Sequence, residues 1–156
     1  MPITRYGIIP RTAIGLIGIF TAPLLHGGLQ HLLSNTVPLL ILLFVLLNFY
    51  PNKALKTIAL IVIAGGSMVW IFGRTANHIG ASGLIYGLAA FIISNGFFEK
   101  KIIPILISLL IIILYGGLIW GVLPFFNSPR ISWEGHLFGA ISGVLIAYSE
   151  NKKTSK

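Results

Sequence analysis

The fold is decided by a stretch in the middle of the chain, Gly80-Ala81-Ser82-Gly83-Leu84-Ile85-Tyr86-Gly87, which sets a serine between glycines at the start of a long apolar run. Glycine lets apolar helices bring their backbones close together. A serine at a helix start lies where backbone N–H groups point outward and where the helix dipole favours negative charge. The stretch therefore combines a candidate nucleophile, an anion-stabilising helix end and a close-packing face.

The composition indicates that a lipid bilayer surrounds this protein. Of its 156 residues, 56% are hydrophobic and only 9% are charged, and the mean hydropathy is +0.94. A soluble domain usually carries about 25% charged residues. The chain has no cysteine, which excludes disulfides and thiolate nucleophiles. The formal charge is +8, but the basic residues flank apolar runs, which is typical of membrane proteins and does not favour a nucleic-acid partner.

The pattern of apolar runs predicts an all-α polytopic membrane protein with five spans. We expect the spans at residues 31–49, 54–72, 82–98, 102–123 and 135–148. Residues 1–25 hold a shorter apolar run, broken by Gly15, Gly18 and Pro23, whereas a span needs about 20 residues. We therefore expect an outer loop or interfacial segment at 1–25, a transmembrane domain at 26–149 and a charged cytoplasmic tail at 150–156.

The basic residues predict the orientation of the bundle. With the N-terminus outside, the inner links carry Lys53, Lys56, Lys100, Lys101, Lys152, Lys153 and Lys156, and the outer segments carry Arg5, Arg11, Arg74 and Arg130. Positive charge is enriched on the cytoplasmic side of membrane proteins. This orientation places Ser82 near the outer face. The compact links favour a bacterial cytoplasmic membrane.

Polar side chains at the outer ends of three predicted spans form one candidate site. His31 and Asn35 are four residues apart, as are Ser82 and Tyr86, and His136 lies near the start of the last span. Residues at this spacing share one helix face. A serine hydroxyl needs a base to become a nucleophile, and a histidine is suited to that task. Asn35, His31 and the Ser82 backbone N–H could stabilise an oxyanion.

Glycines predict that the helices carrying the serine and the histidine touch. Gly83 and Gly87 are four apart on one span, and Gly135, Gly139 and Gly143 are four apart on the other. Small residues at this spacing let helix backbones meet in membranes.

Simpler interpretations stay open for single residues: a serine beside glycine often only packs, His31 and Asn35 could brace the bundle, and Tyr86 could be an interfacial belt residue. We expect His26 and His78 to be loop histidines and Glu134 to be solvated.

The motifs resemble those of the rhomboid intramembrane serine proteases. They are His26-Gly27-Gly28-Leu29-Gln30-His31-Leu32-Leu33-Ser34-Asn35, Gly80-Ala81-Ser82-Gly83 with Tyr86, and His136-Leu137-Phe138-Gly139. The resemblance covers about residues 7–148. It implies a Ser–His dyad without an acidic third member, in which Ser82 is the nucleophile and His136 the general base.

The same resemblance assigns roles to the surrounding residues. His31 and Asn35 would form the oxyanion hole, Tyr86 would stack on the base, and Gly80, Gly83 and Gly139 would support the site. It implies cleavage of single-pass transmembrane substrates near the outer surface, within the lipid bilayer and without a metal or cofactor. The chain shows five of the family's six core spans and lacks the usual Trp-Arg pair of the first loop, so we expect it to be truncated before Met1.

Two other functions remain as alternatives. A catalytically inactive rhomboid-like protein would bind membrane clients without cleaving them, and the intact Ser82 and His136 argue against it. A small transporter would place its site near the midplane between repeats, whereas the polar residues here lie in one leaflet. Metalloprotease and aspartyl protease motifs are absent from the sequence.

Overall fold

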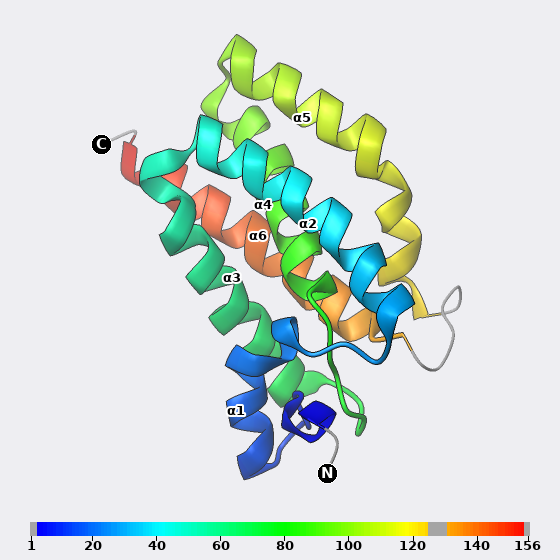
Figure 1. Cartoon of the computed structure of the whole chain (residues 1–156). Helices are drawn as coiled ribbons and strands as arrows, with labels where there is room; N and C mark the ends of the chain where they lie inside the picture. Colours follow the sequence, from blue (N-terminus) through cyan, green and yellow to red (C-terminus); the bar gives the residue numbers. More distant parts are fainter. Residues whose placement is uncertain (1–2, 125–130, 155–156) are drawn as a thin grey trace.

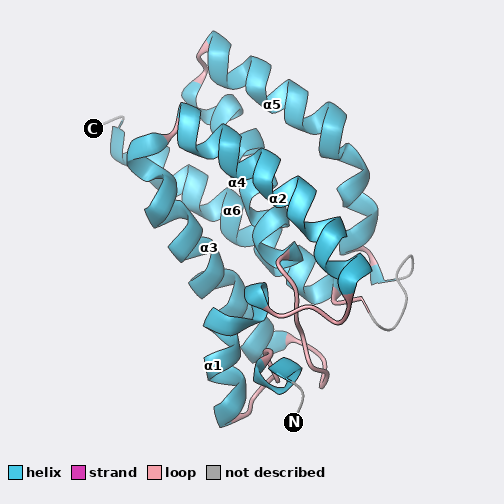
Figure 2. Ribbon diagram, viewed as in Figure 1, coloured by secondary structure: helices cyan, strands magenta, loops and turns pink. Residues whose placement is uncertain are grey.

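Helices make up the regular structure of the described residues, which are 3–124 and 131–154 of a computed structural model (Figures 1 and 2). In chain order the elements are η1 (Ile3–Tyr6), α1 (Ala13–Thr21), η2 (Ala22–Leu24), α2 (Leu29–Phe49), α3 (Pro51–Phe72), α4 (Ser82–Glu99), α5 (Ile102–Tyr115), η3 (Gly116–Val122) and α6 (Trp133–Thr154). The all-helical polytopic fold predicted from the sequence is confirmed. Residues 125–130, within the predicted second outer loop, lie outside the described part.

Membrane-length helices occur where the sequence predicts them. Within residues 3–124 and 131–154, four apolar helical segments are long enough to cross a bilayer: Leu29–Phe49, Pro51–Phe72, Ser82–Glu99 and Ile102–Val122. Helix α6 has 22 residues, which corresponds to about 33 Å at about 1.5 Å per residue. It is more polar than the other four and begins earlier and ends later than the predicted span. The chain is therefore a multi-pass integral membrane protein.

The predicted span 102–123 is not one continuous α-helix. Helix α5 ends at Tyr115, and the chain continues as the 3-10 helix η3, Gly116–Val122. Gly116, Gly117 and Gly121 fall in this second part, and glycine is a poor α-helix former. The predicted span is confirmed as Ile102–Val122, but its last part, η3, is a 3-10 helix that packs against α6.

The segment before α2 folds against the end of the bundle where α3 ends and α4 begins. Helix α1 has nine residues, and its N-cap Thr12 accepts a hydrogen bond from the Gly15 N–H. The Trp70 indole in α3 donates to the Thr12 carbonyl at 2.9 Å. Ile8 pairs with His78 through two backbone hydrogen bonds of 2.9 Å. The short apolar helix therefore packs on α3 without spanning the bilayer.

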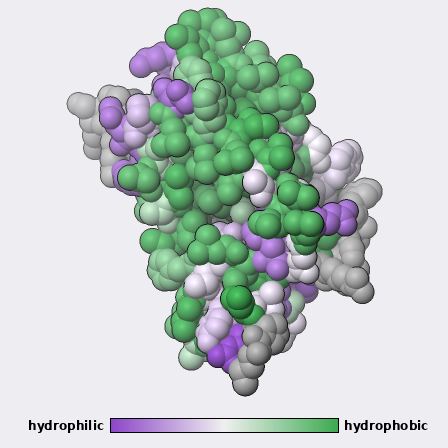
Figure 3. All heavy atoms as spheres, viewed as in Figure 1, coloured by the Kyte–Doolittle hydropathy of each residue, from purple (hydrophilic) through white to green (hydrophobic). Residues whose placement is uncertain are grey.

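Helix α4 lies at the centre of the bundle and contacts α2, α3, α5 and α6 (Figure 1). Its residues Leu88, Phe91 and Ile92 are fully buried. The surrounding helices turn apolar side chains such as Leu40, Phe44 and Ile113 outward. Figure 3 shows the resulting surface as largely hydrophobic, which suits contact with lipid.

Helices α4 and α6 touch backbone to backbone, as their glycines predict. A Cβ added at Gly139 would overlap the Gly83 carbonyl, and one added at Gly143 would overlap the Gly87 carbonyl. These contacts leave no room for side chains at this interface. They bring the first turns of both helices together at the outer end of the bundle.

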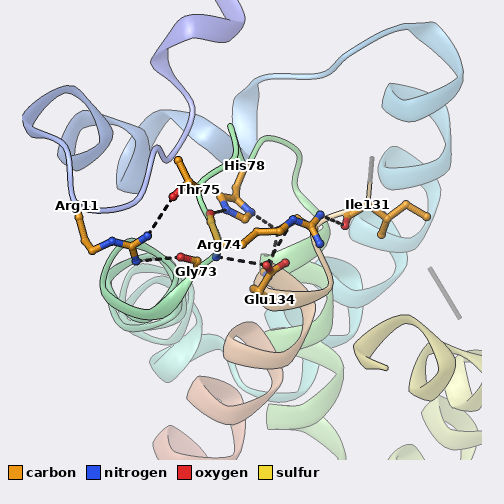
Figure 4. Close-up of polar contacts among 9 residues, drawn as sticks. Arg11, Gly73, Arg74, Thr75, His78, Ile131 and Glu134 are labelled. Atoms are coloured by element: carbon orange, nitrogen blue, oxygen red, sulfur yellow. Dashed lines mark hydrogen bonds and ion pairs between the residues drawn. The ribbon is translucent and has the colours of Figure 1, made fainter. Parts of the chain in front are cut away.

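A polar network ties the loop before α4 to the start of α6 (Figure 4). Arg74 donates to the Ile131 carbonyl at 2.7 Å, and its Nε lies 3.6 Å from Glu134 Oε1. The Arg74 backbone N–H donates to the same Glu134 oxygen at 3.3 Å. Arg11 donates to the Gly73 carbonyl at 2.9 Å and so connects the first loop to the end of α3. The outer loops are thereby held in one arrangement.

His78 continues this network to the N-cap of α6. Its Nε2 lies 3.0 Å from the Arg74 carbonyl, and its Nδ1 lies 2.6 Å from Ser132 Oγ. Because a carbonyl only accepts, Nε2 donates, and in the neutral ring Nδ1 accepts from the Ser132 hydroxyl. Ser132 Oγ in turn accepts from the Gly135 N–H at 3.1 Å, which caps the helix. One chain of hydrogen bonds thus runs from the loop before Ser82 to the helix that carries His136.

One sequence-based expectation is wrong in this region. Glu134 was expected to be solvated, but it is only 2% exposed and paired with Arg74. His78 lies in a loop, as expected, but the sequence did not predict that it is 4% exposed and hydrogen-bonded at both ring nitrogens. The reason is that the loop at 73–80 folds onto the start of α6, a long-range contact that no local pattern reveals.

The glycine interface gives a first prediction. Gly139→Ala should lower the free energy of unfolding by about 1–3 kcal/mol, because the new methyl group meets the Gly83 carbonyl and must separate the helices. Gly116→Ala is the control, since its Cβ would meet nothing within 4 Å. Unfolding can be followed by far-UV circular dichroism in mixed micelles. Equal stability of the two variants would contradict the prediction.

The ion pair gives a second prediction. Arg74→Met should destabilise the protein by about 1–3 kcal/mol, because it leaves the buried Glu134 carboxylate without its cation. The double variant Arg74→Met/Glu134→Met should recover part of the loss, since neither charge is then buried alone. Thermal unfolding of wild type and both variants measures this. A double variant less stable than Arg74→Met would contradict the argument.

Candidate active site

Ser82 and His136 lie in hydrogen-bonding contact. Ser82 is the first residue of α4, and His136 lies in the first turn of α6. The distance between Ser82 Oγ and His136 Nε2 is 2.9 Å. The backbone contact of Gly83 with Gly139 holds the two helices close enough for this bond. A hydroxyl and an imidazole at this distance can exchange a proton.

The imidazole of His136 is held by an aromatic ring. Tyr86, one turn after Ser82 on α4, stacks on it with ring centroids 4.2 Å apart and an interplanar angle of 5°. Both residues are 8% exposed. The stack restrains the ring plane of His136 while its edge faces Ser82.

The second ring nitrogen of His136 has a partner that sequence reasoning missed. Its Nδ1 lies 2.9 Å from the carbonyl oxygen of Gly121 in η3. The partner is a backbone atom in a segment that the sequence predicts as plain α-helix, so residue type gives no signal for it. Ser132 and Arg74 were also missed as neighbours of the site, because their contacts depend on how the outer loops fold.

His31 and Asn35 stand on α2 beside Ser82. The side-chain amide of Asn35, a residue only 5% exposed, donates to the His31 carbonyl at 2.7 Å. His31 Nδ1 accepts from the Gly27 N–H at 3.4 Å, so the neutral ring carries its proton on Nε2. That nitrogen faces Gly80, where a Cβ would come within 2.6 Å of it. His31 thus directs an N–H toward the start of α4, whereas the Asn35 amide is bonded to the His31 carbonyl within α2.

Gly80 is required by the backbone as well as by His31. Its φ of +109° lies in the region that only glycine adopts readily. Its N–H donates to the Ala22 carbonyl at 2.9 Å, which anchors the loop to η2. The turn at Gly80 therefore aims the chain into α4 immediately before Ser82.

A cavity of about 810 Å³ connects these groups. Its lining includes His31, Asn35, Ser82, Tyr86 and His136. The structure therefore brings together the five side chains that the sequence predicts to share one layer. Among residues 3–124 and 131–154, no group of three or more His, Cys, Asp or Glu side chains could hold a metal ion.

The chain was also compared with known proteins. The rhomboid domain family matches residues 14–152. An uncharacterized protein of Mycobacterium tuberculosis (strain ATCC 25618 / H37Rv), Rv1337, is 40% identical over 149 residues, which cover 91% of this chain and 62% of the relative. A Bacillus subtilis (strain 168) protein with the provisional name rhomboid protease YdcA is 30% identical over 136 residues, or 83% of this chain and 65% of that protein.

A plant relative extends the similarity. RHOMBOID-like protein 4 of Arabidopsis thaliana is 31% identical over 133 residues, which cover 80% of this chain and 31% of that protein. The chain spans less than two thirds of the length of these relatives. No solved structure matches it significantly. The family match covers most of the chain, including helices α2 to α5 and nearly all of α6, and the chain therefore belongs to the rhomboid family.

Proposed function

We propose that this protein is an intramembrane serine endopeptidase that cleaves single-pass transmembrane substrates near the outer membrane surface. The observation that carries the proposal is the 2.9 Å hydrogen bond between Ser82 Oγ and His136 Nε2 inside a membrane-embedded bundle. Family membership supports it, and the provisional name of the Bacillus subtilis relative agrees with it.

The dyad would work by acyl transfer. Ser82 Oγ attacks the carbonyl carbon of the peptide bond while His136 Nε2 takes the hydroxyl proton. The tetrahedral intermediate then collapses, and the same proton passes from Nε2 to the leaving amine. A water molecule, deprotonated by Nε2, attacks the resulting acyl-serine ester and releases the new carboxyl end. The proton on Nε2 returns to Ser82.

The oxyanion of the intermediate would be stabilised by donors around the start of α4. The Ser82 backbone N–H belongs to the first turn, where N–H groups have no acceptor within the helix. His31 and Asn35 line the same cavity as Ser82, and the Asn35 amide, which now donates to the His31 carbonyl, would have to turn its second N–H toward the oxyanion. Removing one such donor typically costs about 10²–10³ in kcat.

The position of the cavity supports cleavage near one membrane surface. Ser82, His136 and His31 all lie within the first turn of their helices, so the site is at one end of the bundle. The opposite end carries the lysine-rich links, with Lys53 paired to Glu99 at 3.7 Å and to Glu150 at 3.9 Å. Positive charge favours the cytoplasmic side, which supports a site that faces the outside of a bacterial cytoplasmic membrane.

Substitution of the dyad is the direct test. Ser82→Ala and His136→Ala should each lower cleavage of a model transmembrane substrate by at least about 10³-fold, because neither residue can act without the other. Cleavage is measured in proteoliposomes by gel shift. Ser149→Ala, at the far end of α6, is the control and should retain activity. Wild-type protein that folds, binds the substrate and never cleaves it would support the alternative, a catalytically inactive client-binding protein.

Covalent labelling tests the nucleophile without a substrate. A fluorescent alkyl fluorophosphonate should label wild type on Ser82, because phosphonylation requires a serine activated by a base. Label should disappear in Ser82→Ala and fall strongly in His136→Ala, and mass spectrometry should locate it. Equal labelling of wild type and Ser82→Ala would assign the reactivity to another residue.

A further inference from the structure

The base His136 has two ring nitrogens, and only one arrangement of its proton suits the proposed reaction. Nε2 faces Ser82 Oγ and must offer a lone pair to take the hydroxyl proton. The neutral ring therefore has to carry its own proton on Nδ1. Which nitrogen is protonated is set by the hydrogen bond that the other atom makes. In serine hydrolases with a triad, a buried carboxylate on Nδ1 performs this task.

Among the side chains that the structure describes, no carboxylate is hydrogen-bonded to Nδ1. The chain has three acidic residues. Glu134, two residues before His136, turns toward Arg74. Glu99 and Glu150 belong to the opposite end of α4 and α6, where both contact Lys53. The acceptor that does face Nδ1 is the Gly121 carbonyl, at 2.9 Å.

Position 121 is also shaped for this contact. A Cβ at Gly121 would overlap Tyr86 Oη and lie 3.1 Å from His136 Nδ1. Glycine is thus the residue that lets the backbone of η3 approach the edge of the stacked Tyr86–His136 pair. By contrast, a Cβ at Gly116 or Gly117, in the same 3-10 helix, would meet nothing within 4 Å.

We propose that the Gly121 backbone carbonyl is a positioning group for the base. It accepts a hydrogen bond from Nδ1–H of His136, which keeps the proton of the neutral ring on Nδ1, as a buried carboxylate does in a catalytic triad. The proposal rests on the proposed function for its catalytic meaning. When Nε2 takes the Ser82 proton, the ring becomes an imidazolium, and its Nδ1–H bond to Gly121 becomes charge-assisted and stronger. The contact therefore favours the charged form that appears during proton transfer.

Nitrogen-15 NMR of the wild-type protein in micelles tests the contact itself. With ¹⁵N-labelled histidine and His136→Gln for assignment, the neutral ring should show a protonated Nδ1 and an unprotonated Nε2. This readout does not depend on cleavage, so it distinguishes failure of this inference from failure of the proposed function. A neutral ring with its proton on Nε2 would overturn the inference even in an active enzyme.

Substitution of Gly121 tests whether the contact with His136 contributes to the rate of cleavage. Gly121→Ala should lower kcat by roughly tenfold or more, because the methyl group displaces η3 from the base, with a smaller change in KM. Gly117→Ala, the matched control in the same helix, should keep wild-type kcat. Loss of the Nδ1–H signal in Gly121→Ala, together with retained folding by circular dichroism, is the expected companion result. Wild-type kcat in Gly121→Ala would overturn the inference.

A backbone variant avoids the added methyl group. Replacing Val122 by its α-hydroxy acid turns the Gly121 carbonyl into an ester, a weaker acceptor, without changing any side chain. We expect kcat to fall roughly threefold to tenfold, as for loss of one hydrogen bond. The α-hydroxy acid at Leu118 weakens the Gly117 carbonyl instead and should leave kcat unchanged. Equal kcat and equal His136 spectra in the two ester variants would overturn the inference.

Discussion

The backbone contact between α4 and α6 is the constraint on which the site depends. Gly139 lies against the Gly83 carbonyl and Gly143 against the Gly87 carbonyl, so the helices approach more closely than side chains would allow. In a bilayer, where lipid removes most of the hydrophobic drive for helix association, such contacts gain dispersion energy. The separation they fix is what places an imidazole from one helix within 2.9 Å of a hydroxyl from the other.

The loops at the same end of the bundle orient the first turns of α4 and α6. The turn at Gly80 aims the chain into α4, and the hydrogen bonds through His78 and Ser132 fix the start of α6. The ion pair of the exposed Arg74 with the buried Glu134 links the same two segments. Distance is thus supplied by apolar packing within the membrane, and orientation is supplied by polar contacts at its surface.

Much of this arrangement could be predicted from the sequence because it follows from repeating patterns. Glycines four apart predicted the α4–α6 contact, and apolar runs predicted the spans. The rest depends on contacts between distant segments. The change to a 3-10 helix at Gly116 accompanies the contact of the Gly121 carbonyl with Nδ1 of His136, and the fold of the loop at 73–80 buries Glu134 and His78. Neither a backbone acceptor nor the way a loop closes changes the periodicity of residue types, so these features could not be predicted from the sequence.

The hydroxyl, the imidazole and the carbonyl that faces it come from three segments of the chain, α4, α6 and η3. Individual helices insert into a bilayer before they associate. During biogenesis, a newly inserted chain would therefore hold an ordinary serine and an ordinary histidine, separated by lipid. Under the proposed function, the three groups would therefore meet only when the last helix docks, so that activation of the serine would be a late step of assembly.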